Sequence, residues 1–130
     1  MFGILHSKKG FTLVELIVVV IIVGILASVA IPMMSGNIAA AKKTEAIAAM
    51  GTIRTVERLV KAETTGYQDV AAGAFNATAN VNKYINSPDL NGKYYNAGNY
   101  SVTGNVITAT VGFDTSAPGG TMNMDTGATT

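Results

Sequence analysis

The stretch from Leu16 to Met34, LIVVVIIVGILASVAIPMM, contains no charged residue. As an α-helix it would span about 28 Å, which is close to the thickness of the hydrocarbon core of a bilayer. Its Leu, Ile and Val residues favour membrane insertion by roughly 3–6 kcal/mol, which exceeds the cost of about 3 kcal/mol for Glu15 at mid-bilayer. The stretch therefore predicts a membrane-competent helix.

The composition of the chain excludes several classes of function. The chain has 130 residues, a net charge of +1 and 13% charged residues, with no cysteine and one histidine, His6. Disulfides, thiol catalysis and metal or triad chemistry built on several histidines are therefore excluded. The sequence shows no Ser/His/Asp set, metal cluster or phosphate loop, so it predicts neither an enzyme nor a cofactor. The low net charge also argues against a nucleic-acid partner.

A second, amphipathic helical stretch follows the apolar one, from about residue 37 to residue 63, and Thr64-Thr65-Gly66 predicts its end. Its apolar side chains recur at helical spacing, which suits packing against a small sheet. A basic group on another side is open to three interpretations: a solvated face, contact with an acidic neighbouring surface and, least favoured because no aromatic residues interleave with the charges, nucleic-acid binding. The apolar stripe consists of Ala46, Ala49, Met50, Ile53, Val56 and Val60, and the basic group of Lys43, Arg54, Arg58 and Lys61.

The region after Gly66 predicts a small antiparallel sheet. Residues 100–113 alternate between apolar and polar, with Ile107, Ala109, Val111 and Phe113 on one face. Gly104-Asn105 is typical of a tight hairpin turn.

The segments on either side of this sheet predict little regular structure. Residues 67–99 are rich in Asn, Ala and Gly and indicate a connecting region, with one helical turn near Val81–Ile85. Residues 114–130 are small and polar and predict a loop or a loosely held tail. The predicted fold class is α+β, with a long N-terminal helix, apolar in its first half and amphipathic in its second, packed on a small sheet.

The residues that indicate function lie just before the apolar stretch. Two lysines and Gly10 are followed by Phe11, Thr12 and a lone carboxylate at Glu15. The segment from Lys9 to Leu16, KGFTLVEL, with the apolar run after it, closely resembles the class III signal sequence of type IV prepilins. The related pseudopilins of type II secretion carry the same signature. The resemblance is specific, because the glycine, the aromatic residue, the carboxylate and the apolar span must all keep their spacing.

The resemblance implies a pilin-like fold and a sequence of processing steps. A membrane prepilin peptidase would cut between Gly10 and Phe11, and the new amine of Phe11 would be N-methylated. The precursor would reside in the lipid of the inner membrane, and an assembly machinery there would move it into a helical homopolymer at the cell surface. The implied division is a leader (1–10), a transmembrane and filament-core helix (11–36), an amphipathic helix (37–66) and a small sheet head with a polar tail (67–130).

Glu15 has two interpretations that are compatible at different stages. Thr12-Leu13-Val14-Glu15 is a capping-box pattern, in which the carboxylate satisfies a backbone N–H at the helix start. An unpaired carboxylate in a bundle of apolar helices would cost several kcal/mol, and the amine of Phe11 on a neighbouring subunit is its natural partner. Such pairing would also set the axial register of the subunits.

Pro32 interrupts the hydrogen bonding of the predicted helix, because it has no N–H to donate to the Ser28 carbonyl. A kink or a boundary between two helices is one interpretation. The resemblance adds another: the family segment corresponding to Gly24 through Pro32 often loses helical order in the filament, which would lend the fibre extensibility.

Two alternatives to a pilus subunit remain open. The first is a pseudopilin, whose N-terminal signature is the same. The second is a secreted soluble domain with an ordinary signal peptide, cut after Ser28-Val29-Ala30 so that the mature chain begins at Ile31.

The polar tail departs from the usual family pattern, because many pilins close it with a disulfide and this chain has no cysteine. Packing between subunits is the first expectation for what holds residues 114–130. A calcium site that uses Asp114 or Asp125 is the less favoured one, since no dense carboxylate loop is present.

Overall fold

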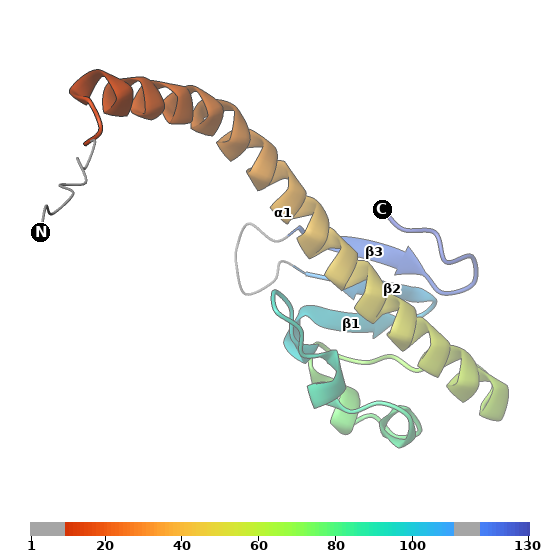
Figure 1. The fold of residues 1–130 in the computed structure, drawn as a ribbon. Coiled ribbons are helices and arrows are strands. Elements are labelled where there is room, and N and C mark those ends of the chain that lie inside the picture. Colours follow the sequence, from red (N-terminus) through yellow and green to blue (C-terminus); the bar gives the residue numbers. More distant parts are fainter. Residues whose placement is uncertain (1–9, 111–117) are drawn as a thin grey trace, which may run out of the picture. The chain divides into compact units, whose positions relative to one another are not determined.

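The computed structural model describes residues 10–110 and 118–130 of the chain. One long helix, α1 (Leu13–Glu63), is followed by strands β1 (Tyr100–Thr103), β2 (Val106–Ala109) and β3 (Gly120–Asn123) (Figure 1). The expected α+β class, a long N-terminal helix with a small antiparallel sheet, is confirmed. The chain divides into two compact units, residues 1–36 and 37–130, which are described separately below.

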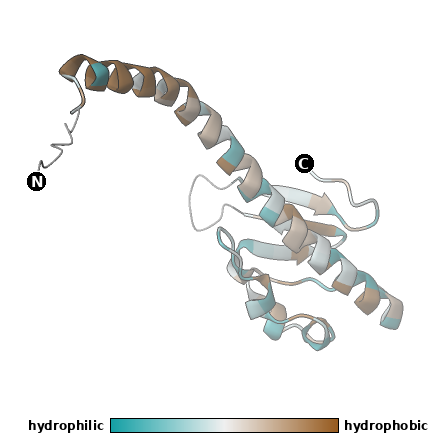
Figure 2. Cartoon of the chain, in the orientation of Figure 1, coloured by the Kyte–Doolittle hydropathy of each residue, from teal (hydrophilic) through white to brown (hydrophobic). Residues whose placement is uncertain are grey.

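In the first unit, every described side chain is exposed. This part of α1 is predominantly apolar, with Glu15 as its one charged residue (Figure 2), and by length and composition α1 is able to cross a membrane. The helix continues without interruption past Pro32, so the interpretation of a boundary between two helices at this proline is wrong. Of the expected leader, only Gly10 lies among the described residues.

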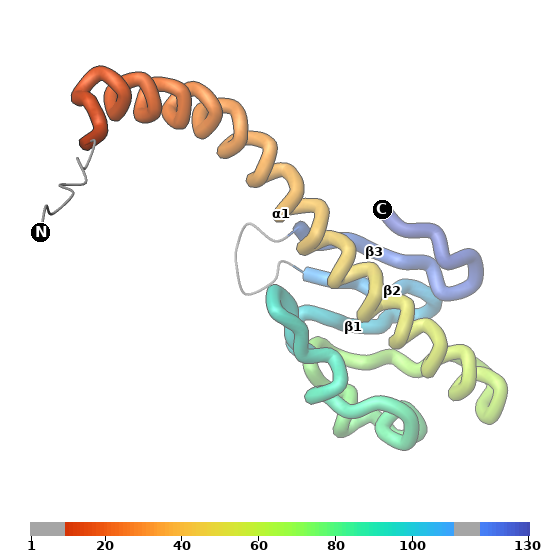
Figure 3. Tube along the Cα trace, viewed as in Figure 1, coloured from red at the N-terminus to blue at the C-terminus, as the bar shows by residue number. Residues whose placement is uncertain are grey.

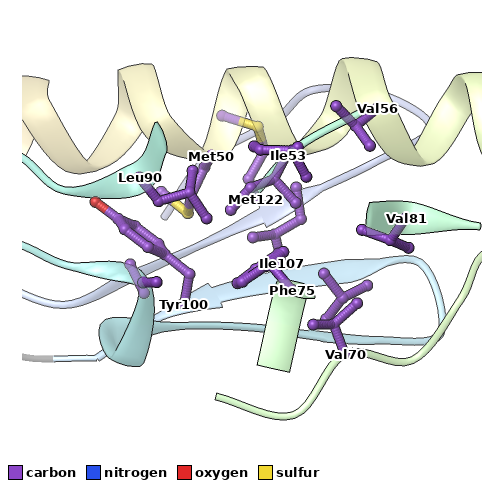
Figure 4. Packing of buried hydrophobic residues seen from close by; sticks show 14 of the residues in the cluster. Met50, Ile53, Val56, Val70, Phe75, Val81, Leu90, Tyr100, Ile107 and Met122 are labelled. Carbon is purple, nitrogen blue, oxygen red and sulfur yellow. The ribbon is translucent and has the colours of Figure 1, made fainter. Parts of the chain in front are cut away.

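In the second unit, the amphipathic part of α1 covers one face of the sheet. Met50 and Ile53 point from the helix toward Ile107 and Met122 of the strands (Figure 4). The expected stripe is confirmed: Ala46, Met50, Ile53, Val56 and Val60 are buried, and Ala49 is partly buried.

The sheet has the order β1-β2-β3 and both pairings are antiparallel. Thr103 pairs with Val106, so Gly104 and Asn105 form the expected two-residue hairpin turn. Gly104 has a φ of +57°, a conformation that favours glycine. Ile107 and Ala109 share the buried face as expected, whereas Val111 and Phe113 lie outside the described residues.

The segment 67–99 is more ordered than a connecting region. The expected turn is present as the 3₁₀ helix η2 (Val81–Lys83), with η1 (Ala74–Asn76), η3 (Ser87–Leu90) and η4 (Ala97–Asn99) around it. Each short helix buries one apolar side chain, and other core residues lie between them. The core residues from this segment are Val70, Phe75, Val81, Ile85, Leu90, Tyr95 and Ala97.

The expectation of a loop or loosely held tail is wrong for the described residues 118–130. Gly120–Asn123 forms β3 against β2, and Met122 and Met124 are buried. After β3 the chain turns and returns beside it (Figure 3), where Asn123 N donates to the Ala128 carbonyl at 2.9 Å. The apolar–polar alternation of Met122, Asn123 and Met124 was the sequence signal for this strand.

Candidate assembly site at the N-terminal helix

The start of α1 is closed by a capping box between Thr12 and Glu15. Glu15 N donates to Thr12 Oγ1 at 3.2 Å, and Thr12 N lies 3.5 Å from Glu15 Oε2. Thr12 Oγ1 is also 3.4 Å from this oxygen. The capping interpretation of Glu15 is thus confirmed, and Thr12 is the N-cap because α1 begins at Leu13.

Both contacts of the carboxylate of Glu15 use the same oxygen, Oε2. Within residues 10–110 and 118–130, nothing donates a hydrogen bond to Oε1 of Glu15. The carboxylate is exposed, so it retains an acceptor while the cap is intact. Capping and contact with another chain can therefore coexist at this residue.

The Gly10–Phe11 bond lies outside the helix, in extended or irregular chain before Leu13. Phe11 is 80% exposed. A Cβ added at Gly10 would meet no atom within 4 Å, so the fold does not require glycine there.

Gly24 and Pro32 both lie within the uninterrupted helix α1. A Cβ at Gly24 would also meet nothing within 4 Å. The Ser28 carbonyl lacks its helical donor because residue 32 is proline, while Ser28 Oγ donates to the Ile25 carbonyl at 2.7 Å. This segment is therefore helical but weaker than an uninterrupted helix.

The basic group of the second helical stretch has partners that the sequence did not reveal. Arg54 Nε donates to the Met124 carbonyl at 2.7 Å, and Lys61 Nζ lies 3.3 Å from Asp125 Oδ1. Both partners belong to the C-terminal residues of the same chain, 70 and 64 positions away. Lys43 and Arg58 are exposed, as a solvated face requires.

The calcium expectation is not supported in the described residues. Asp125 already accepts hydrogen bonds from Tyr67, Lys61 and Asn105 through its two carboxylate oxygens. Across the described part of the chain, no group of three or more His, Cys, Asp or Glu could hold a metal ion. Asp114 lies outside the described residues.

The exposed Gly10–Phe11 junction, the capped apolar helix that follows it and the small sheet unit form the pilin-like arrangement that the resemblance implies. Residues 5–31 match a family model described as a prokaryotic N-terminal methylation motif. The chain is 37% identical over 105 residues to the fimbrial protein EcpC of Eikenella corrodens, an alignment that covers 80% of this chain and 63% of that protein.

Two further relatives match over shorter lengths. The type IV major fimbrial protein FimA of Dichelobacter nodosus is 46% identical over 48 residues, 37% of this chain and 31% of FimA. A fimbrial protein of Pseudomonas aeruginosa is 41% identical over 51 residues, 39% of this chain and 33% of that protein. The chain thus spans less than two thirds of the length of these relatives. No solved structure matches the chain.

The methylation motif and the names of these relatives confirm the resemblance to type IV pilins that the residues around Glu15 indicated. The names denote structural fimbrial proteins and not enzymes, as the sequence predicts.

Proposed function

We propose that this chain is the structural subunit of a type IV pilus, and that it polymerises through the apolar part of α1. The observation that carries the proposal is the exposure of every side chain in the apolar first part of α1, which begins inside a methylation motif. Apolar surface of this extent needs a non-aqueous environment. A membrane supplies one before assembly, and a bundle of identical helices supplies one afterwards.

The proposed route begins in the inner membrane. A prepilin peptidase cuts between Gly10 and Phe11, Phe11 is N-methylated, and an assembly machinery transfers the subunit into a helical homopolymer on the cell surface. The transfer is favourable only because the receiving bundle is as apolar as the lipid that the helix leaves. The names of the fimbrial relatives support a pilus over a pseudopilus.

Glu15 sets the register of neighbouring subunits in this proposal. Its Oε2 stays on the cap with Thr12, and its Oε1 accepts from the methylated amine of Phe11 on the next subunit. Because that amine keeps its positive charge on methylation, the contact is an ion pair inside an apolar bundle. A shift of one subunit along the bundle would leave both charges unpaired, which costs several kcal/mol.

The segment from Gly24 to Pro32 gives the filament its extensibility in this proposal. It lacks one helical hydrogen bond at Ser28, and it contains a glycine whose backbone is the least restricted of any residue. Neither feature contributes a packing contact in the isolated chain. We expect this segment to lose helical order first when the subunits are packed or pulled.

The experiment that tests the proposal combines intact-mass analysis with electron microscopy of filaments sheared from cells that express the full chain. We expect filaments whose subunit begins at a methylated Phe11. A soluble monomer beginning at Ile31 would show that the segment is an ordinary signal peptide. Subunits that begin at methylated Phe11 but form no surface filament would favour the pseudopilin.

A further inference from the structure

The described C-terminal residues, 118–130, which we call the strap, close one side of the second unit. Strand β3 of the strap pairs with β2, with Met122 opposite Ile107. Met124 N donates to the Asn105 carbonyl at 2.8 Å, and the side chain of Met124 is fully buried. The strap therefore covers both the core and the outer edge of β2.

One exposed carboxylate joins the strap to three other parts of the chain. Asp125 Oδ1 accepts from Tyr67 Oη at 2.6 Å and from Lys61 Nζ at 3.3 Å, and Oδ2 accepts from Asn105 Nδ2 at 3.0 Å. The Lys61 ammonium also lies 4.0 Å from the centre of the Tyr67 ring. These donors come from α1, from the chain after α1 and from the hairpin turn.

The charges around Asp125 reinforce these contacts. The hydrogen bonds from Tyr67 and Asn105, followed by that from Lys61, lower the pKa of Asp125 to about 2. Arg58 lines the same groove as Lys61, Tyr67 and Asp125. The carboxylate of Asp125 is therefore ionised at neutral pH.

The backbone of the strap contacts a further cationic side chain, Arg54. Arg54 Nε and Nη2 donate to the carbonyls of Met124 and Asp125 at 2.7 and 3.1 Å. Gly127 has a φ of +77°, and a Cβ placed there would be 3.0 Å from Arg54 Nη1. The turn after β3 thus needs glycine both for its conformation and for the close approach of the guanidinium.

We propose that Asp125 is the latch of the strap: loss of its contacts lets the strap separate from β2 more readily, while β1, β2 and α1 stay folded. The contacts of Asp125 are half exposed, so water and salt reach them, and the chain has no cysteine to replace them with a covalent link. The opening is therefore reversible without redox chemistry. An open strap bares the outer edge of β2, which then becomes a template for pairing with another chain.

Hydrogen exchange of the full chain in detergent micelles tests the latch. In Asp125→Asn we expect the amides of β3 to exchange about tenfold faster, while those paired between β1 and β2 change less than about twofold. Tyr67→Phe removes one donor but keeps the ring beneath Lys61, so we expect the same pattern at a smaller amplitude. This milder variant keeps the test available if Asp125→Asn does not fold.

Glu63→Gln is the matched control, because it breaks another exposed ion pair of this unit, Lys83–Glu63, at the same 3.3 Å separation. We expect it to leave exchange in β3 unchanged. Equal acceleration in β1, β2 and β3 of the Asp125 and Tyr67 variants would overturn the proposal, since the strap would then not open separately. Unchanged exchange in both variants would overturn it as well, since Asp125 would then not be the latch.

Discussion

The two parts of α1 use their apolar side chains in opposite ways. Between Leu13 and Gly36 every side chain is exposed, whereas after residue 37 the apolar stripe is buried against the chain's own strands. The apolar surface of the first part remains available for burial against lipid or other copies of the chain. That of the second part is buried within the monomer. One helix therefore combines an apolar surface that is exposed in the monomer with an intramolecular core, and in the proposed filament the exposed part is the intermolecular one.

The largest expected effect concerns the intermolecular part. Replacing Glu15 with valine removes the acceptor of both the cap and the proposed contact with Phe11. In cells that co-express wild-type and variant chains, we expect the variant's share of sheared filaments to fall more than tenfold, because a bundled Phe11 amine without a partner costs several kcal/mol. Quantitative mass spectrometry of filaments and membranes measures the two shares.

Leu16→Val serves as the control, since it changes an adjacent exposed side chain of the same helix without altering charge. We expect it to enter filaments about as well as the wild type. Equal incorporation of the Glu15 variant would contradict the register role and leave Glu15 with its cap alone.

The next prediction compares one substitution in both parts of the helix. Ile53 is 1% exposed and Ile21 is 56% exposed. In detergent, Ile53→Ala should lower the free energy of unfolding of the second unit by about 2–5 kcal/mol, because it leaves a cavity beneath the sheet. Ile21→Ala should change it by less than about 0.5 kcal/mol.

Urea titration followed by the near-ultraviolet signal of the tyrosines measures both values, since all five tyrosines follow residue 66. A loss of similar size in the two variants would mean that the first part of α1 is buried against the same chain.

The contrast within α1 also explains how much the sequence could predict. Hydrophobicity and helical spacing identify both parts of the helix, because each depends on local pattern alone. The hairpin was predictable from Gly104-Asn105 for the same reason. The capping box required only four consecutive residues, Thr12 to Glu15.

What the sequence could not predict depends on contacts between distant residues. Phe75 and Leu90 enter the core from 3₁₀ helices with no regular spacing, so no periodicity reveals them. The tail looked loosely held because its anchors, Arg54 and Lys61, lie more than 60 residues away. Their positive charge was visible in the sequence, but the carbonyls and the carboxylate that they meet were not.

A third prediction compares glycines in the two parts. A Cβ at Gly92 would overlap the carboxylate of Glu45, whose Oε1 accepts from Tyr94 N at 2.8 Å and Tyr95 N at 3.0 Å. Gly92→Ala should therefore destabilise the second unit by about 1–3 kcal/mol. Gly24→Ala has open space around it and should leave that unit unchanged while it strengthens α1 by up to about 1 kcal/mol.

Urea titration reports the effect at Gly92, and circular dichroism at 222 nm during heating reports the effect at Gly24. If Gly92→Ala were as stable as the wild type, Glu45 could move without loss, and its two hydrogen bonds would not hold the loop.

The smallest expected effect concerns a buried carboxylate that the second unit must accommodate. Glu57 is fully buried, its Oε2 accepts from Gln68 N at 2.9 Å, and its Oε1 has no hydrogen-bond partner in the described residues. Burial raises the pKa of Glu57 above its usual value of 4.5, assisted by the negative charge of Asp69 and opposed by the Gln68 hydrogen bond. The contribution of Glu57 to the free energy of unfolding is therefore largest at low pH, and it is lost as the pH rises through the folded-state pKa.

Glu57→Gln should remove this loss. The free energy of unfolding of the variant, relative to that of the wild type, should therefore rise by about 1 kcal/mol between pH 4 and pH 8. Glu63→Gln is the control of opposite sign. The hydrogen bonds from Tyr84 and Lys83 lower the pKa of Glu63, so its contribution is present above about pH 4.5 and lost on acidification. Paired urea titrations at the two pH values measure both differences. If the Glu57 variant instead lost stability relative to the wild type as the pH rose, the ionised form of Glu57 would stabilise the folded state.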